Sequence, residues 1–346
     1  METIEHLVIG AGPAGLRAAQ VLAEAGREVV VLEKHDDVGP KTCAGGLTLK
    51  AVRELTPLGL GADAGLVSVG HIVFTGGVAR ALDPAATTIR TIPRRDLGQL
   101  QLRWAKQAGV EVRTGAPATA LDLTARTVTV ADRQIGYRHL IGADGADSSV
   151  RRALGLPHPR ACFAAEYNVP RLRLEPLRVE CDPDALANGY FWVFPHETYT
   201  SIGAVAPKKL IPPAMIRRYL TARAQALGAE EPLPPFEAAT LEVQFSGFDF
   251  RDDVHLVGDA AGVPSALTAE GIYAALVTGE ETARRILDPA FPSPKTRSWL
   301  KVKRAHDRLS RLLGLGLVRR WTLAGLACLA RWAPGASATA AWFLDG

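Results

Sequence analysis

The feature that most constrains this chain is the segment Gly10-Ala11-Gly12-Pro13-Ala14-Gly15, whose glycines follow the pattern G-x-G-x-x-G. An apolar strand predicted over 4–9 precedes it, and a helix predicted over 16–25 follows it. A second strand, predicted over 28–32, ends at the acid Glu33. A β-α-β unit with this glycine turn and this acid is typical of dinucleotide binding.

Each glycine of the turn has a separate physical role. Gly10 permits the tight turn, Gly12 lets the backbone approach a pyrophosphate, and Gly15 lets the helix pack close to the strand. The helix N-terminus offers unpaired N–H groups to a diphosphate. Glu33 is placed to accept hydrogen bonds from a ribose diol and disfavours a 2′-phosphate.

Length and composition indicate an ordinary globular protein of about two domains. The chain has 346 residues, of which 47% are hydrophobic and 22% charged. The four cysteines show no metal-ligand spacing, which favours a reduced, intracellular setting and no metal site. The strand at residue 4 leaves no room for a cleavable leader, so we expect a cytoplasmic protein.

The C-terminal part of the chain is basic. Residues 297–346 carry nine Lys or Arg against Asp307 and Asp345, although the whole chain is only +4. A basic segment of this kind suits anionic phospholipid or an anionic substrate, so peripheral membrane contact through 297–331 is one interpretation. The four leucines at 309, 312, 313 and 317 share a helical face, and packing of that helix on its own domain is the favoured alternative. No nucleic-acid motif is present, and we expect a monomer.

Two later segments extend the candidate site. Gly142-Ala143-Asp144-Gly145 follows a predicted strand and runs into Ser149-Val150-Arg151. Val257-Gly258-Asp259-Ala260-Ala261-Gly262 follows another strand and leads to Glu270-Gly271-Ile272. An aspartate at a strand end can accept from a hydroxyl group, and small neighbours admit a bulky cofactor. A helix opening near Gly271 directs its positive end at whatever lies above it.

With the first turn, these motifs resemble FAD-dependent flavoproteins of the p-hydroxybenzoate hydroxylase-like fold, over roughly residues 1–290. The resemblance is closer to the geranylgeranyl reductase branch. It implies FAD as cofactor, and it implies that Arg94 lies near the FAD diphosphate, where a guanidinium suits phosphate oxygens. A solvated Arg94, or Arg95 in its place, is the alternative. The other cofactor-binding residues that the resemblance implies are Lys34, Ala118, Asp144, Gly145, Gly258, Asp259, Gly262, Gly271 and Ile272.

Two further segments carry the resemblance to the reductase branch. The first, 41–47, is similar to the K-x-C-G-G-G-L segment of that family, with Ala44 in place of the first glycine. It adds Cys43, Ala44 and Gly45 to the implied cofactor contacts. Cys43 is also a candidate catalytic residue, because a thiol beside a flavin can donate a proton or form a transient adduct. Its small size is the alternative reason for a cysteine there.

The second segment, 190–195, matches the pattern Y-x-W-x-F-P. In a strand, Tyr190, Trp192 and Phe194 point to one face and form an apolar wall that suits a polyprenyl chain. A core strand of the sheet is the alternative. The chain departs from the family at 263–272, where Ala266 and Ala269 stand in place of a usual proline and glycine. The methyl group of Ala269 is expected near the flavin ring.

The sequence therefore predicts an α/β protein with a Rossmann-like FAD-binding domain containing a mixed sheet, an inserted antiparallel β-sheet substrate domain and a C-terminal helical segment. The predicted FAD-binding domain is discontinuous and comprises 1–65, 90–162 and 246–288. The substrate domain comprises 66–89 and 163–245, and the basic helical segment comprises 289–346.

The resemblance implies an FAD-dependent oxidoreductase that reduces C=C bonds of an isoprenoid lipid, whether geranylgeranyl or another polyprenyl, a diphosphate or a quinone. The expected electron donor is NAD(P)H or reduced ferredoxin. Cys43, Tyr190 and bound water are candidate proton donors, and His196 is a weaker one. The alternatives are an FAD-dependent monooxygenase that hydroxylates or epoxidises a small apolar or aromatic substrate, and a non-catalytic protein that binds FAD or a lipid.

Overall fold

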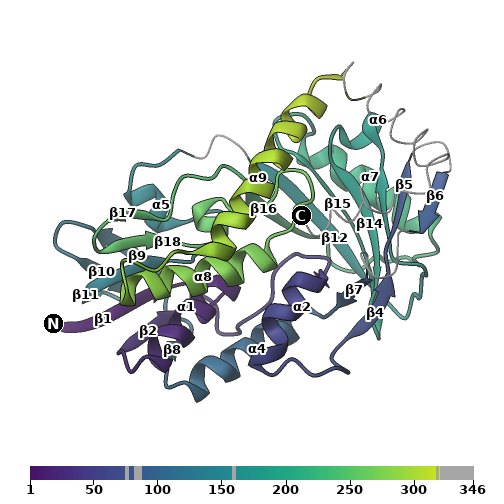
Figure 1. Cartoon of the computed structure of the whole chain (residues 1–346). Helices are drawn as coiled ribbons and strands as arrows, with labels where there is room; N and C mark the ends of the chain where they lie inside the picture. The colour runs from purple at the N-terminus through teal and green to yellow at the C-terminus, as the bar shows by residue number, and fades with distance from the viewer. Residues whose placement is uncertain (75–77, 82–87, 158–160, 317–318, 320–346) are drawn as a thin grey trace.

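The computed structural model describes residues 1–74, 78–81, 88–157, 161–316 and 319. Two large sheets lie side by side, with α8 and α9 in front of them in the view of Figure 1. The helices are α1 (Pro13–Glu24), α2 (Leu49–Leu55), η1 (Thr56–Leu58), α4 (Arg94–Gln107), α5 (Ser149–Ala153), α6 (Pro183–Leu186), α7 (Pro213–Ala226), η2 (Gly258–Ala261), α8 (Ile272–Leu287) and α9 (Pro294–Leu313).

The larger sheet has a parallel centre. Its eight described strands include the path β17 (Asp249–Arg251), β18 (Val254–Leu256), β11 (Arg133–Gly142), β1 (Glu2–Ile9), β2 (Val29–Leu32) and β8 (Glu111–Arg113). An antiparallel hairpin of β9 (Ala118–Asp122) and β10 (Thr127–Val130) joins the side of β11. All four residues of β2 are buried, as expected for a parallel strand covered on both faces.

Helices α1, α4 and α8 pack on one face of this sheet. Val8 of β1 lies in that core, whereas its neighbour Leu7 faces the opposite core, because successive strand residues alternate. A Cβ at Gly279 of α8 would lie 2.2 Å from the carbonyl oxygen of Ala14. The glycine therefore lets α8 approach the first turn of α1 closely.

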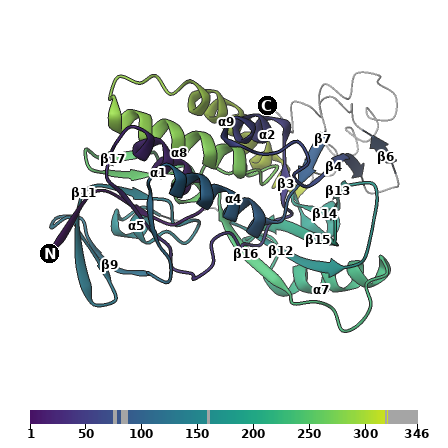
Figure 2. The ribbon, with the colours of Figure 1, turned by 90° about the horizontal axis from the view of Figure 1, so that it is seen from below.

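The second sheet has seven described strands in the order β16 (Glu237–Glu242), β12 (Ala161–Pro170), β15 (Tyr199–Pro207), β14 (Tyr190–Pro195), β13 (Arg178–Cys181), β5 (His71–Phe74) and β6 (Val78–Ala81). Its neighbours pair antiparallel except β13 and β5, which are parallel. Helix α7 covers one face, and Figure 2 shows it on the far side of this sheet from α9.

A small third sheet joins β3 (Gly46–Leu47), β7 (Thr88–Thr91) and β4 (Leu66–Val69). Strand β4 therefore pairs with β7, and of the described part of 66–89 only β5 and β6 enter the seven-stranded sheet. The domain boundaries given above remain predictions.

Helix α9 runs from beside α8 toward α6 and the seven-stranded sheet (Figure 1). Of the four leucines predicted on one face, Leu309 and Leu313 line a mostly apolar cavity, while Leu312 is 53% exposed. Leu317 and most of 317–346 lie outside the described residues. Among the residues described, none of the helices has the length and apolar character needed to cross a bilayer.

Candidate active site

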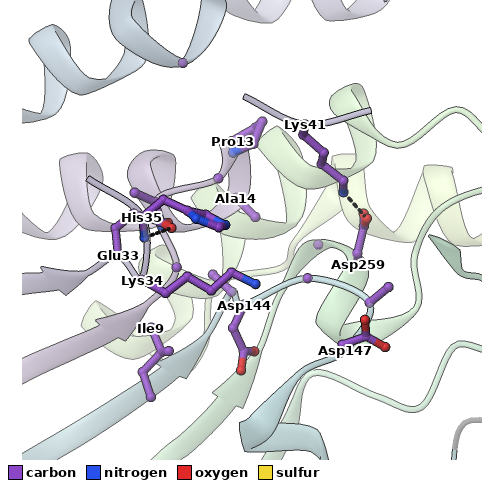
Figure 3. A pocket seen from close by; sticks show the side chains of 18 of the residues that line it. Ile9, Pro13, Ala14, Glu33, Lys34, His35, Lys41, Asp144, Asp147 and Asp259 are labelled. Carbon is purple, nitrogen blue, oxygen red and sulfur yellow. Dashed lines mark hydrogen bonds and ion pairs between the residues drawn. The ribbon is translucent and has the colours of Figure 1, made fainter. Parts of the chain in front are cut away.

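A polar cleft of about 590 Å³ opens at the carboxyl ends of β1, β2, β11 and β18 (Figure 3). In an open parallel sheet, this edge is where ligands bind. Twelve of the residues predicted from the sequence line it. They are Gly10, Gly12, Pro13, Ala14, Glu33, Lys34, Arg94, Ala118, Asp144, Gly145, Gly258 and Asp259.

The glycine turn between β1 and α1 forms the floor of this polar cleft. Gly10 has a φ of 105°, in the left-handed region that favours glycine. A Cβ at Gly15 would lie 2.0 Å from the carbonyl oxygen of Gly10, so a side chain there would push α1 away from the turn. A Cβ at Gly12 meets no protein atom within 4 Å. The backbone at Gly12 is therefore open to a ligand at the positive end of α1.

The acid at the end of β2 is fixed against this turn. Glu33 Oε2 accepts a hydrogen bond from the backbone N–H of Ala11 at 2.8 Å, and Oε1 accepts one from the backbone N–H of His35 at 3.1 Å (Figure 3). Each carboxylate oxygen keeps lone-pair capacity for a further donor. A ribose diol supplies donors of the right kind.

Two polar groups in the lining of the cleft have an atom without a protein partner. In the described part of the chain, Nη1 of Arg94 and Oδ1 of Asp144 are buried and make no hydrogen bond. The other oxygen of Asp144 accepts from the N–H and hydroxyl of Ser149, at 2.6 and 2.7 Å, at the start of α5. A buried donor and a buried acceptor left open fit a ligand that carries both phosphate oxygens and hydroxyl groups.

An ion pair spans the polar cleft between two of the motifs. Lys41 Nζ lies 2.7 Å from Oδ2 of Asp259, which is the aspartate at the end of β18 (Figure 3). The carboxyl side chain is 13% exposed and the lysine side chain 41%. The loop that contains Cys43 is thus tied by its lysine to the loop that leads to α8.

A second, mostly apolar cavity of about 300 Å³ lies between the seven-stranded sheet, the loop before α8, and α9. Thr42 lines both this apolar cavity and the polar cleft, so the two meet at the loop that contains Cys43. Seven of the predicted residues line it. They are Cys43, Ala44, Tyr190, Trp192, Phe194, Gly271 and Ile272.

Cys43 sits at the junction as a neutral thiol. Burial raises the pKa of its thiol, which disfavours the thiolate. Its backbone N–H donates to Oε1 of Glu166 at 2.8 Å. Glu166 is 1% exposed, burial raises the pKa of its carboxyl group, and its Oε2 accepts from the hydroxyl of Ser201 at 2.7 Å. Glu166 therefore joins the Cys43 loop to the seven-stranded sheet.

The aromatic residues of β14 alternate between the two faces of the sheet. Tyr190, Trp192 and Phe194 line the apolar cavity, while Phe191 and Val193 belong to the core under α7. The hydroxyl of Tyr190 donates to the carbonyl oxygen of Thr268 at 2.6 Å, and burial raises the pKa of that phenol. Nε1 of Trp192 donates to the hydroxyl of Ser201 at 2.9 Å.

Three predicted residues line neither cavity and have packing roles instead. Gly15 permits the α1 approach described above. Gly45 has a φ of 72°, and a Cβ there would lie 2.5 Å from the carbonyl oxygen of Ile92. Gly262 has a φ of 72° as well, and its Cβ would lie 1.9 Å from the carbonyl oxygen of Gln244. His196 also lies outside both linings, with Nε2 3.0 Å from the carbonyl oxygen of Ala44.

Sequence reasoning did not assign Lys41, Glu166 or Glu270 to the site. Glu270 lines the apolar cavity, accepts from the hydroxyl of Thr48 at 2.9 Å and lies 2.9 Å from Nζ of Lys50. The sequence signal that could have indicated such residues is an acidic side chain within an apolar segment, as at Glu166 in the middle of β12.

The parallel sheet, the open glycine turn and the acid at the end of β2 define the class of this chain as a dinucleotide-binding protein. The chain belongs to the FAD binding domain family, which it matches over residues 3–276, and it is a flavin-dependent oxidoreductase. The predicted α/β fold class, with its mixed and antiparallel sheets, is confirmed, as is the resemblance to geranylgeranyl reductases.

Two relatives by sequence are named as reductases. Menaquinone reductase of Mycobacterium tuberculosis is 31% identical over 325 residues, which cover 83% of this chain and 77% of that protein. Digeranylgeranylglycerophospholipid reductase 1 of Methanopyrus kandleri is 28% identical over 330 residues, covering 87% and 84%.

Two solved structures share the fold. A geranylgeranyl bacteriochlorophyll reductase-like protein of Thermoplasma acidophilum has a TM-score of 0.78 at 21% identity, covering 96% of this chain and 92% of that chain. PqsL of Pseudomonas aeruginosa, described as "a probable FAD-dependent monooxygenase", has a TM-score of 0.68 at 20% identity, covering 94% and 99%. At these identities, the likeness concerns the fold alone.

Proposed function

We propose that this flavoenzyme reduces C=C bonds in the isoprenoid chain of a lipid. The observation that carries the proposal is the junction at Thr42, where a cleft suited to FAD meets a cavity lined mostly by apolar side chains. The names of the two sequence relatives support an isoprenoid substrate. The head group, diphosphate or quinone, is not part of the proposal.

We assign the polar cleft to FAD and propose which part of the cofactor each residue would contact. Gly12 and Arg94 would hold the diphosphate, Glu33 the ribose of the adenosine half, and Asp259 the ribityl hydroxyls, since each offers the donor or acceptor that the group requires. Lys34 and Ala118 would lie at the adenine end, and Asp144, Gly145 and Gly258 would shape the middle. Cys43, Ala44, Gly271 and Ile272 would border the flavin ring. Gly45 and Gly262 would contribute through the close backbone packing that they permit behind the site.

Bound FAD supplies, when reduced, a hydride equivalent for one alkene carbon. The chain must supply a proton for the other. The thiol of Cys43 stays protonated at neutral pH because burial raises its pKa, so it is a proton source rather than a nucleophile. Tyr190 is less suited, since its hydroxyl already donates to the carbonyl of Thr268. Cys43 is therefore the proposed catalytic residue.

An apolar cavity suffices to bind such a chain. Burying a CH₂ group contributes about 0.8 kcal/mol, so one five-carbon unit contributes on the order of 4 kcal/mol without any polar contact. Tyr190, Trp192 and Phe194 form the proposed wall for the hydrocarbon. An isolated alkene has no carbonyl to polarise, so positioning must account for much of the rate.

The remaining assignments are also proposals. The electron donor is NAD(P)H or reduced ferredoxin, and the protein acts as a cytoplasmic monomer. The part of 297–331 that reaches beyond α9 lies mostly outside the described residues, and any peripheral membrane contact through it belongs to this proposal.

An anaerobic experiment tests the function. The purified flavoprotein is reduced with dithionite, and geranylgeranyl diphosphate or menaquinone is added. We expect reoxidation of the flavin absorbance together with a gain of two hydrogen mass units per bond reduced, located in the isoprenoid chain of the recovered lipid rather than in a quinone ring. Reduced protein that is never reoxidised by either lipid contradicts the proposal.

A monooxygenase is the second candidate, because PqsL shares the fold over nearly the whole chain. It would require oxygen consumption that rises when a small aromatic substrate is added. NADPH-dependent, substrate-stimulated hydroxylation would replace the reductase proposal with this one. FAD that binds but cannot be reduced by NADPH, dithionite or ferredoxin would favour a non-catalytic protein.

A further inference from the structure

Helix α9 carries a stripe of polar side chains, each of which forms a hydrogen bond to the same loop. Trp299, Lys303, His306 and Ser310 recur every three or four residues, so they lie on one face of the helix. They bond, in the same order, to four consecutive residues at 263–266. The contacts are Trp299 Nε1 to Val263 O at 3.0 Å, Lys303 Nζ to Pro264 O at 2.8 Å, His306 Nδ1 to Ser265 Oγ at 3.0 Å, and Ser310 Oγ to Ala266 O at 3.2 Å.

Among the residues of this stripe, Lys303 gives the strongest evidence that the helix holds the loop. Its side chain is 1% exposed, although a lysine is almost never fully buried without partners. The ammonium donates to the carbonyl oxygens of Val243 and Pro264, both at 2.8 Å, and lies 3.2 Å from a carboxylate oxygen of Asp307. Desolvating an ammonium is costly, so its three donors are all directed at acceptors.

The loop held in this way continues into the proposed active site. Residues 267–273 line the apolar cavity, and Thr268 accepts the hydrogen bond of Tyr190. The hydroxyl of Ser265 also accepts from the N–H groups of Leu267 and Thr268, at 3.2 and 3.1 Å. His306 therefore acts, through Ser265, on the turn that leads to the start of α8.

The neighbouring face of α9 forms part of the wall of the same cavity. Leu309 and Leu313, in the last turns of the helix, line this cavity. Asn188, which follows α6, donates to the carbonyl and hydroxyl oxygens of Ser310 at 3.1 and 3.0 Å. One helix thus contacts the cavity, the turn between α6 and β14, and the loop proposed to border the flavin.

We propose that Lys303 is a positioning residue, and that the polar stripe of α9 holds the 263–271 loop in register between the polar cleft and the apolar cavity. This rests on the proposed location of the flavin ring, beside Gly271. Lys303 touches no reacting atom. Its loss should loosen the loop and change the surroundings of the ring, while the diphosphate and ribose contacts at Gly12, Arg94 and Glu33 remain.

The test compares Lys303→Met with Lys301→Met, which removes a lysine from the exposed side of the same helix. Hydrogen exchange of the apoprotein is measured first, on peptides covering 263–271. We expect exchange about tenfold faster in Lys303→Met and unchanged in Lys301→Met, because only the first loses bonds to the loop. Exchange in 10–24 should not change in either variant.

FAD titration and the visible spectrum are measured next on the loaded proteins. In Lys303→Met we expect an FAD Kd within about threefold of the parent and a shifted visible absorption band of the flavin. With a reducible lipid, kcat should fall about tenfold while KM changes less, since a misplaced loop affects alignment more than apolar binding.

If Lys303→Met does not fold, Ser310→Ala replaces it, because it removes one loop contact at Ala266 and no charge. It should accelerate exchange at 263–271 by a smaller factor. A folded variant with parental exchange in this loop and a parental flavin spectrum overturns the inference. A parent protein that binds no FAD, or never transfers electrons to a lipid, defeats the proposed function instead and leaves the exchange result to be read on its own.

Discussion

The polar cleft and the apolar cavity are built in opposite ways. Backbone turns at strand ends form the cleft, and its main requirement is space, as at Gly12, where a Cβ would meet nothing in the protein. Side chains from many elements form the cavity, from Ile72 on β5 to Leu313 at the end of α9. Ligand access to the cleft depends on the lack of a side chain at Gly12, whereas the shape of the cavity depends on the side chains that line it. Substitutions should therefore separate the two regions cleanly.

The largest change in FAD affinity is expected at the glycine turn of the cleft, where two similar substitutions should have different results. Gly15→Ala should cost about 3 kcal/mol of folding free energy, because its methyl would lie within 2.0 Å of a backbone oxygen. Gly12→Ala should leave the apoprotein near parental stability but weaken FAD binding about 100-fold, on the order of 3 kcal/mol, since its methyl would occupy open space at a residue that lines the cleft.

Thermal unfolding of the apoproteins and FAD titration distinguish these outcomes. Equal loss of stability in both variants would mean that the space above Gly12 is occupied by protein. Parental FAD affinity in Gly12→Ala would remove the diphosphate from this turn and, with it, the proposed direction of the cofactor.

In the apolar cavity, a substitution should lower stability and leave FAD binding nearly unchanged. Phe194→Ala should cost about 3–5 kcal/mol of stability, because the ring is 8% exposed and packs against Gly46. FAD affinity should remain within about threefold, since no atom of Phe194 lines the cleft. The same two measurements apply. A variant that loses FAD while keeping its stability would contradict the division of the molecule into two regions.

The same division explains how much could be predicted from the sequence. The cleft is visible because each contribution is a short local pattern, such as the turn at Gly10–Gly15 or the aspartate at the end of β18. The sequence does not show which of these segments meet in the folded protein. Lys41 and Asp259 form an ion pair although 218 positions separate them. The three aromatic residues of β14 could be assigned to one face from strand periodicity alone.

The opposite wall of the cavity could not be predicted in this way. The leucine pattern of α9 indicates an amphipathic helix but does not say which surface it covers. Lys303 has a basic neighbour on each side of it, at 301 and 304, and nothing local marks it as the one that is buried. Its burial depends on two carbonyl groups, at Val243 and Pro264, that tertiary packing brings to it.

A smaller effect is expected from pH, and it involves histidines of both regions, because His6 and His139 lie on strands of the larger sheet and His306 lies on α9. Burial lowers the pKa of His306 on α9 to about 4 and lowers the pKa of His6, His139 and His196 as well. The unfolded chain, with histidines near 6.5, binds more protons than the folded one between these values. Stability should therefore fall as pH drops from about 6.5 toward 4.

Urea unfolding at pH 7 and pH 5 measures this decline. Glu166 opposes it, because burial raises the pKa of its carboxyl group and the folded state then binds the extra proton. His306→Gln should flatten the decline more than a change at any exposed residue of α9. The same slope in His306→Gln and the parent would mean that this histidine does not contribute.

The smallest effect is expected at Ala269, in the loop before α8. Its φ of 52° lies in the left-handed region, which costs an alanine about 1 kcal/mol relative to glycine. The residue also lines the apolar cavity, between the carbonyl that holds Tyr190 and the start of α8. Ala269→Gly should therefore raise stability by about 0.5–1 kcal/mol and add a methyl's volume to the cavity.

Ala266→Gly is the matched control in the same loop. Ala266 is 8% exposed and is not among the residues with positive φ, so glycine there should lower stability by about 0.5–1 kcal/mol. Opposite signs for the two variants, measured by urea unfolding of the apoprotein, would establish that Ala269 is held in a strained conformation by its surroundings. Two losses would mean that the contacts of the methyl outweigh the backbone cost. In that case Ala269 belongs with the side chains that fill the cavity, rather than with the backbone turns that form the cleft.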